Sequence, residues 1–114
     1  MRRDRDRLAD IAEAASKIRD RTQRGRAAFD HDEDLQIVLT HLIQIIGEAA
    51  SRLSADLLSA HPDVPWRAII GMRHRVVHDY FAIDPDILWT AATRDVPTLA
   101  GHIHTILDQL PPDG

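Results

Sequence analysis

The amino-acid sequence predicts an all-α fold, an antiparallel bundle of four to five helices. Through most of the 114 residues, apolar side chains recur every three or four positions, which is the spacing of one helix face. No stretch alternates apolar and polar residues in the way that a half-buried strand does. Capping residues and prolines separate the apolar runs and indicate where helices begin. The length fits a single domain, residues 1–114, with residues 110–114 as a flexible tail.

The first two predicted helices are long, and each has one apolar face. The stripe on the first helix consists of Leu8, Ile11, Ala15, Ile18 and Thr22. We expect this helix to stop near Gly25, because glycine readily adopts the backbone angles that end a helix. The second helix begins near Asp32–Asp34, whose carboxylates suit a helix N-terminus, and continues to Leu53.

A short helical segment and a third long helix follow. Ser54 is a capping residue that starts a short turn, which ends at His61-Pro62. Pro65-Trp66 opens the third long helix, because a proline in the first turn loses no hydrogen bond. The apolar spacing carries this helix toward Tyr80.

Two prolines mark the C-terminal part of the chain. Asp84-Pro85 combines a capping carboxylate with a first-turn proline and therefore begins another helix. Pro97 indicates a kink or a restart before a last helix that runs to Leu107.

Composition excludes several classes of protein. The absence of cysteine rules out a disulfide framework and a cysteine-based zinc site. No apolar run approaches the ~20 residues of a membrane span, so we expect a cytoplasmic protein with no membrane association. The net charge of −4 is unevenly spread, because residues 1–28 hold nine Lys/Arg against five Asp/Glu while the remainder holds five against thirteen. The first helix therefore offers a phosphate-binding face, unless its mixed charges are simply solvated.

Polar side chains crowd one end of the third helix, in the run Arg73-His74-Arg75-Val76-Val77-His78-Asp79-Tyr80. On a continuous helix, His74 and His78 stack on one face, but zinc needs a third protein ligand that the sequence does not supply. We therefore expect no metal and no cofactor. Cations near a helix C-terminus also stabilise it, so part of this cluster has a structural explanation.

The same cluster contains the groups that RNA cleavage requires. An imidazole such as that of His78 can take a proton from a ribose 2′-OH or deliver one to the leaving 5′-oxygen. A guanidinium such as that of Arg73 can hold two phosphate oxygens and stabilise charge that develops at phosphorus. The segment is therefore a candidate site for chemistry on the RNA backbone.

The pattern Arg73-x4-His78-x-Tyr80 resembles the motif of the HEPN superfamily, in particular the HepT family of toxin–antitoxin toxins. Further similarities lie in Asp4–Leu8, in Ile46-Gly47-Glu48-Ala49-Ala50, in Pro65-Trp66-Arg67 and in Gly71-Met72-Arg73, so the resemblance spans residues 4 to about 107. One departure is His74, where the family more often has another polar residue such as asparagine.

The resemblance implies a HEPN-like bundle that forms a homodimer, with two motif copies facing a shared cleft. It further implies a metal-independent endoribonuclease whose catalytic residues are Arg73 and His78. The implied partner is an MntA-type nucleotidyltransferase antitoxin that transfers AMP to Tyr80 and so neutralises the toxin. Glu48, His74 and Asp79 then become candidate residues lining the cleft.

Two alternatives stay open at this point. The protein is either the nuclease itself or a non-catalytic module that holds a nucleotide for its nucleotidyltransferase partner through Arg73 and His78. Glu48, which lies between apolar helix positions, either lines the cleft or pairs with a nearby arginine.

Overall fold

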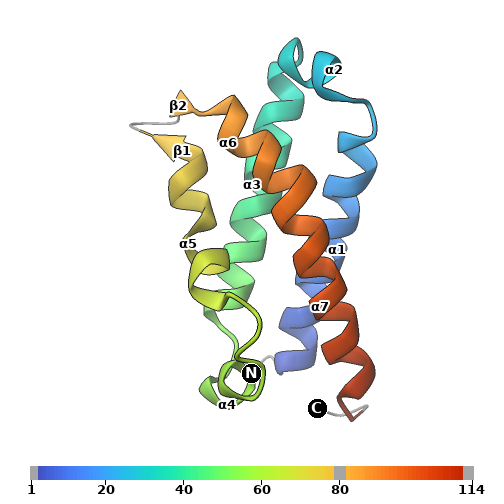
Figure 1. The fold of residues 1–114 in the computed structure, drawn as a ribbon, viewed down its shortest axis with the longest axis vertical. Helices are drawn as coiled ribbons and strands as arrows, with labels where there is room; N and C mark the ends of the chain where they lie inside the picture. Colours follow the sequence, from blue (N-terminus) through green and yellow to red (C-terminus); the bar gives the residue numbers. More distant parts are fainter. Residues whose placement is uncertain (1–2, 79–81, 112–114) are drawn as a thin grey trace.

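The computed structural model describes residues 3–78 and 82–111, and these form a helical bundle. Its four long helices are α1 (Asp4–Thr22), α3 (Glu33–Ser51), α5 (Trp66–Val76) and α7 (Val96–Gln109). They alternate in direction, so that α1 begins and α7 ends at the same end of the bundle (Figure 1). The predicted all-α antiparallel bundle is confirmed.

Shorter elements connect the long helices. These are α2 (Arg26–Asp30), α4 (Ala55–Ala60), the strand pair β1 (Val77–His78) and β2 (Ala82–Ile83), α6 (Pro85–Thr90) and a π-helical turn (Ala91–Asp95). The π-helical turn joins α6 directly to α7, and Pro97 is the second residue of α7. The restart predicted at Pro97 is therefore a widened turn within one continuous helical segment.

Three predicted helix starts are confirmed by capping hydrogen bonds. The carboxylate of Asp32 accepts from the backbone N–H of Leu35 at the start of α3. The hydroxyl of Ser54 caps α4, and it also donates to Asp4 at 2.6 Å, which ties α4 to the beginning of α1. The carboxylate of Asp84 accepts from two backbone N–H groups in the first turn of α6.

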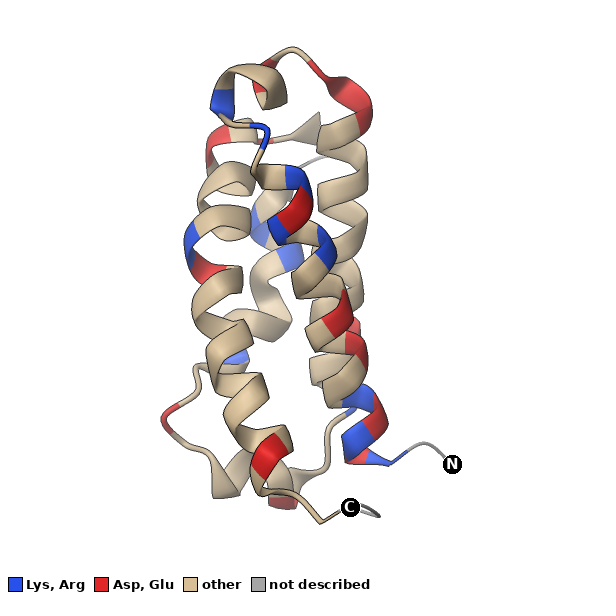
Figure 2. Ribbon diagram, turned by 90° about the vertical axis from the view of Figure 1, so that its right-hand side faces the viewer, with Lys and Arg blue, Asp and Glu red and all other residues tan. Residues whose placement is uncertain are grey.

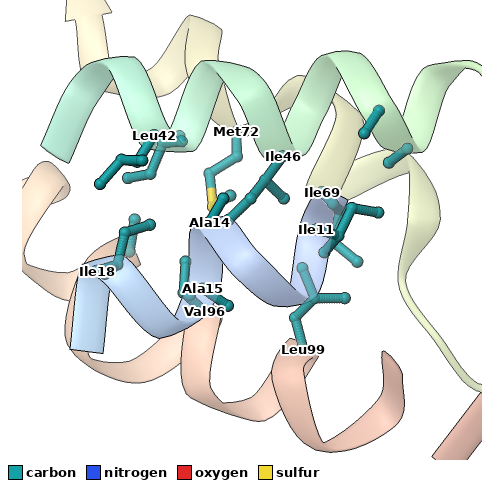
Figure 3. Close-up of a cluster of buried hydrophobic side chains, with 14 of the residues drawn as sticks. Ile11, Ala14, Ala15, Ile18, Leu42, Ile46, Ile69, Met72, Val96 and Leu99 are labelled. Carbon is teal, nitrogen blue, oxygen red and sulfur yellow. The ribbon is translucent and has the colours of Figure 1, made fainter. Parts of the chain in front are cut away.

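The core lies between α1, α3, α5 and α7. The apolar stripe predicted for α1 is buried from Leu8 to Ile18, whereas Thr22 is only half-buried. Figure 3 shows part of this core, with Ile11 and Ala14 facing Ile46 and Met72 across the bundle. Within the described parts of the chain, no helix is long and apolar enough to span a membrane.

The end of α5 differs from the prediction. The helix stops at Val76 instead of continuing toward Tyr80, and Val77 takes an extended conformation with φ −110° and ψ 122°. Val77 then pairs with Ile83, and the backbone N–H of Asp84 donates to the carbonyl of Val76 at 2.9 Å. Two consecutive β-branched residues weaken helix propensity, and the ladder satisfies the backbone groups that the helix releases. The expectation of no strand was therefore wrong over these four residues.

Helix α2 was also missed by the sequence analysis, because five residues are too few to show a helical period. Gly25, with φ 90°, ends the connection from α1 as predicted. Arg26 then pairs with Asp30 and Asp86 at 2.7 and 2.6 Å and lies over the ring of Phe29. These contacts join α2 to α6 at the end of the bundle that carries β1 and β2 (Figure 1).

Candidate active site

The site begins with a close approach of α5 to α3 at Gly47. A Cβ atom at this position would lie 3.2 Å from the carbonyl oxygen of Ile70 and 3.9 Å from the Cδ atom of Arg73. Glycine therefore lets the α5 backbone sit directly against α3 and lets the Arg73 side chain pass over it. The next residue along α3, Glu48, is brought within reach of Arg73 as a result.

Glu48 lies between two arginines. One carboxylate oxygen, Oε2, accepts from Nη1 of Arg73 at 3.2 Å across the α3–α5 contact. The other, Oε1, accepts from Nε and Nη2 of Arg52 at 2.8 and 2.7 Å, one turn further along α3. Since each oxygen has its own arginine, the carboxylate has a fixed orientation, and it in turn limits where the Arg73 guanidinium can lie.

The electrostatics agree with this geometry. Hydrogen bonding and charge from Arg52, with a smaller contribution from Arg73, lower the pKa of the Glu48 carboxyl. Glu48 therefore stays ionised at neutral pH. The Nε atom of Arg73 is buried and has no hydrogen-bond partner among the described residues. The side chain as a whole is 35% exposed.

The Arg73 guanidinium faces a shallow groove of about 420 Å³ that crosses α3 toward α1. The groove is lined by Arg7, Asp10, His41, Gln44, Ile45, Glu48, Ala49 and Arg73. Its volume falls within the roughly 300–1,000 Å³ that is usual for small-molecule sites. Arg73 and Glu48 therefore occupy the wall of a groove that can take part of a larger substrate.

The second half of the motif lies beyond the helix. His78 belongs to β1, with its backbone opposite Ala82, and its side chain lies outside what the structure describes. Asp79 and Tyr80 also lie outside the described residues. Because α5 ends at Val76, the backbone of His78 lies beyond the helix that carries His74, so the helical i, i+4 spacing considered for this pair does not apply.

His74 lies in a different groove from Arg73. It is exposed and lines a second groove, of about 540 Å³, together with Asp86 of α6 and Asp95 of the π-helical turn. Of the described candidates, the structure thus brings Arg73 and Glu48 together and keeps His74 apart from them.

Sequence reasoning missed Arg52, which pairs with Glu48, and two residues that line the Arg73 groove, Arg7 and Gln44. Arg52 was detectable, because it follows Glu48 by four residues and such pairs meet on a helix. Gln44 was detectable in the same way, because it precedes Glu48 by four residues on α3. Arg7 gave no such signal, because only the packing of α1 against α3 brings it to the same groove as Arg73.

Comparisons with known proteins point to one family. The family model for HepT-like ribonucleases matches residues 11–106. A protein of Thermococcus cleftensis named "Probable ribonuclease HepT" is 35% identical over 100 residues, which cover 85% of this chain and 89% of that protein. A "Putative RNase" of Methanocaldococcus jannaschii is 29% identical over 100 residues, covering 87% and 92%. A "Putative RNase" of Caldanaerobacter subterraneus is 32% identical over 81 residues, covering 71% and 72%.

No solved structure matches the chain. The family model covers most of the sequence, and its matched range contains Gly47, Glu48, Arg73 and His78. The chain therefore belongs to the HepT-like ribonuclease family of the HEPN superfamily.

Proposed function

We propose that this HepT-like protein is a metal-independent endoribonuclease and the toxin of a toxin–antitoxin pair, acting in the cytoplasm. The observation that supports it best is the ion pair of Arg73 with Glu48, which holds a partly exposed guanidinium at the wall of an open groove. A fixed cation of this kind suits a phosphate group on which negative charge develops.

The proposed reaction is attack of a ribose 2′-oxygen on the adjacent phosphorus. A bond forms between the 2′-oxygen and phosphorus, and the bond from phosphorus to the 5′-oxygen breaks. One imidazole takes the proton of the 2′-OH, and an acid protonates the leaving 5′-oxygen. Arg73 holds the non-bridging phosphate oxygens, and His78 supplies the imidazole. The products carry a 2′,3′-cyclic phosphate and a 5′-OH.

The test compares His78→Ala with His74→Ala, two substitutions of the same type on either side of the end of α5. Purified protein is incubated with RNA and a chelator, and the new ends are identified by mass spectrometry. Cleavage by wild type and His74→Ala, but not by His78→Ala, supports the proposal. The same fragments from all three proteins would contradict the role of His78. If none cleaves RNA, and wild type and His74→Ala bind ATP whereas His78→Ala does not, the nucleotide-holding module is the better description.

We also propose that the active form is a homodimer. In-line attack benefits from a base and an acid on opposite sides of phosphorus, whereas each chain offers one motif histidine. Ile37 and Val38 are 50% and 38% exposed and lie in the first turns of α3. Such exposed apolar residues suit a two-fold contact between identical helices.

The dimer proposal is tested by Ile37→Asp. We expect light scattering to show a monomer, circular dichroism to show unchanged helix content, and RNA cleavage to be lost. Gln36→Asp would be a poor comparison because Gln36 bonds to Phe29, so Ile87→Asp, an exposed apolar position on α6, is the control. A monomeric Ile37→Asp protein with full activity would contradict the shared site.

The proposed off switch is transfer of AMP to Tyr80 by an MntA-type antitoxin. The tyrosine oxygen forms a bond to the α-phosphorus of ATP, and pyrophosphate leaves. The modification adds negative charge and bulk next to the motif, where an RNA phosphate would otherwise bind. Mass spectrometry after incubation with the partner and ATP should show added AMP on the wild type. Tyr80→Phe that still acquires AMP would show that the acceptor is a different residue.

A further inference from the structure

The groove beside Arg73 extends beyond the motif to a residue of α1. Arg7 lines it from the α1 side, Gln44 and His41 line its floor on α3, and Arg73 lines it from the α5 side. The positions of His41, Gln44 and Glu48 are spaced at three and four residues, so these side chains share the exposed face of α3.

Arg7 differs from the other basic residues of α1. Arg5 donates to the carbonyl oxygens of Leu107, Leu110 and Pro111 and so caps α7. Lys17 pairs with Glu13 at 3.2 Å, and Arg21 donates to the carbonyl of Lys17. Arg7 has no side-chain hydrogen bond or ion pair within residues 3–78 and 82–111. Figure 2 shows that acidic and basic residues are mixed along α1, so the helix has no continuous basic face.

Donors in the groove are unused, whereas its acidic groups are engaged. Among the described residues, the guanidinium of Arg7 and the amide of Gln44 have no partner, and the Arg73 side chain, which is 35% exposed, pairs only with Glu48. Glu48 is held by two arginines, and Asp10 has an interaction of its own. The groove therefore offers two guanidinium groups and an amide to an incoming ligand, which matches a nucleotide with its phosphate and its base.

We propose that this groove binds the nucleotide next to the scissile phosphate, with Arg7 on the neighbouring phosphate and Gln44 on the base edge. The inference rests on the proposed function, because it takes Arg73 as the residue at the scissile phosphate. The RNA strand then crosses α3 from α5 to α1. Single-stranded RNA suits such a groove, since its unstacked bases can be read by side-chain amides and its backbone by arginine.

The test measures binding of a fluorescent single-stranded RNA to His78→Ala protein over a series of KCl concentrations. Removing one phosphate contact should lower the slope of log affinity against log salt by about 0.7. We expect this change for Arg7→Ala and a larger loss of affinity for Arg7→Glu. Arg94→Ala is the matched control, because Arg94 is exposed on the π-helical turn and its guanidinium has no partner among the described residues. Equal slopes for Arg7→Ala and Arg94→Ala overturn the proposal.

A second measurement addresses the base contact. Affinities of the Gln44→Ala protein for oligo(A), oligo(C), oligo(G) and oligo(U) should be more alike than those of the parent protein. An unchanged ranking overturns the role of Gln44. The outcomes also separate the two proposals, because binding is measured without cleavage. If the wild-type protein cleaves RNA but Arg7→Ala leaves the salt slope unchanged, the proposed function stands and the proposed role of the groove is wrong. If the wild-type protein does not cleave RNA but Arg7→Ala lowers the salt slope, the groove binds RNA as proposed and the proposed nuclease activity is wrong.

Discussion

Arg73 and Arg75 stand two residues apart on α5, yet their surroundings differ. Arg73 faces α3, is 35% exposed, and donates to Glu48. Arg75 faces the opposite side, where two grooves of about 210 and 540 Å³ separate α5 from the π-helical turn and α7. Its guanidinium is exposed and makes no hydrogen bond or ion pair with any described residue. The arginine on one face of α5 is thus held by an ion pair, whereas the arginine on the opposite face is exposed to solvent.

The contrast bears on the role proposed for Arg73 at a phosphate group. A solvated guanidinium must lose side-chain entropy when it binds a phosphate, whereas one that is already oriented loses less. Gly47 creates this difference, because it brings α5 close to α3 on the Arg73 side only.

The largest expected effect is a fall in the RNA cleavage rate of the Arg73→Ala protein. Losing one preorganised donor at a developing charge typically lowers rates by about 10² to 10³. Arg75→Ala removes the same charge from the same helix and should stay within a few-fold of wild type. Single-turnover cleavage of end-labelled RNA measures both rates, and equal losses for the two variants would mean that net charge alone matters.

A smaller effect is expected for Gly47→Ala. Its Cβ would lie 3.2 Å from the Ile70 carbonyl oxygen, so α5 must shift and carry Arg73 away from Glu48. Misplacing a catalytic group by 1 Å costs up to about 10² in rate, and a shift of a few tenths should cost roughly tenfold.

The control is Gly71→Ala, on α5 itself, where an added Cβ meets no atom within 4 Å. Alanine in a helix interior is favoured over glycine by about 1 kcal/mol, so this variant should raise the free energy of unfolding and leave cleavage unchanged. Urea denaturation should show no comparable gain for Gly47→Ala. If Gly47→Ala kept full activity and gained as much free energy of unfolding as Gly71→Ala, the close α3–α5 contact would not depend on glycine at position 47.

A substitution at Glu48 should lower the cleavage rate less than Gly47→Ala does. Glu48→Gln keeps an oxygen that accepts from Arg73 but loses the charge, so we expect a several-fold fall in the cleavage rate with little change in the thermal midpoint. Arg52→Gln removes the charge of the second arginine that holds the Glu48 carboxylate. Its cleavage rate should therefore lie between those of wild type and Glu48→Gln. A variant that lost stability and activity in proportion would indicate a structural role only.

The smallest effect concerns pH. The pKa of Glu48 is lowered in the folded protein, chiefly by Arg52. Its stabilising contribution is therefore complete above the unfolded pKa of about 4.3 and is lost as the pH falls through the lower folded value. Between about pH 5 and pH 3, Glu48→Gln should lose less stability than wild type. The pKa of Asp32 is also lowered, by the hydrogen bond that its carboxylate accepts from the backbone N–H of Leu35. Asp32 therefore contributes equally to the pH dependence of stability of wild type and Glu48→Gln.

The sequence predicted the fold well where helices are long. The apolar stripe of α1 and the capping residues Asp32, Ser54 and Asp84 all act locally, so their spacing carries the information. The end of α5 was not predictable in this way. Whether Val77 continues the helix or pairs with Ile83 depends on a partner strand that follows only after the motif loop.

The site was predictable only in part. The motif identified Arg73, and the Gly47-Glu48 pair was noted as part of the resemblance, but its purpose appeared only with the α3–α5 contact. Arg7 is 66 positions from Arg73 in the sequence, and nothing in the local pattern of α1 singles it out. Such residues become visible only when helix packing is known.

The central claim is that Glu48 and Arg73 act as one unit, and a double-mutant cycle tests it most directly. Single-turnover cleavage rates are measured for Glu48→Gln, Arg73→Ala and the double variant. If Glu48 acts by positioning Arg73, the double variant should cleave no more slowly than Arg73→Ala alone. A double variant slowed by the product of the two single effects would show that the residues act independently and would contradict the account.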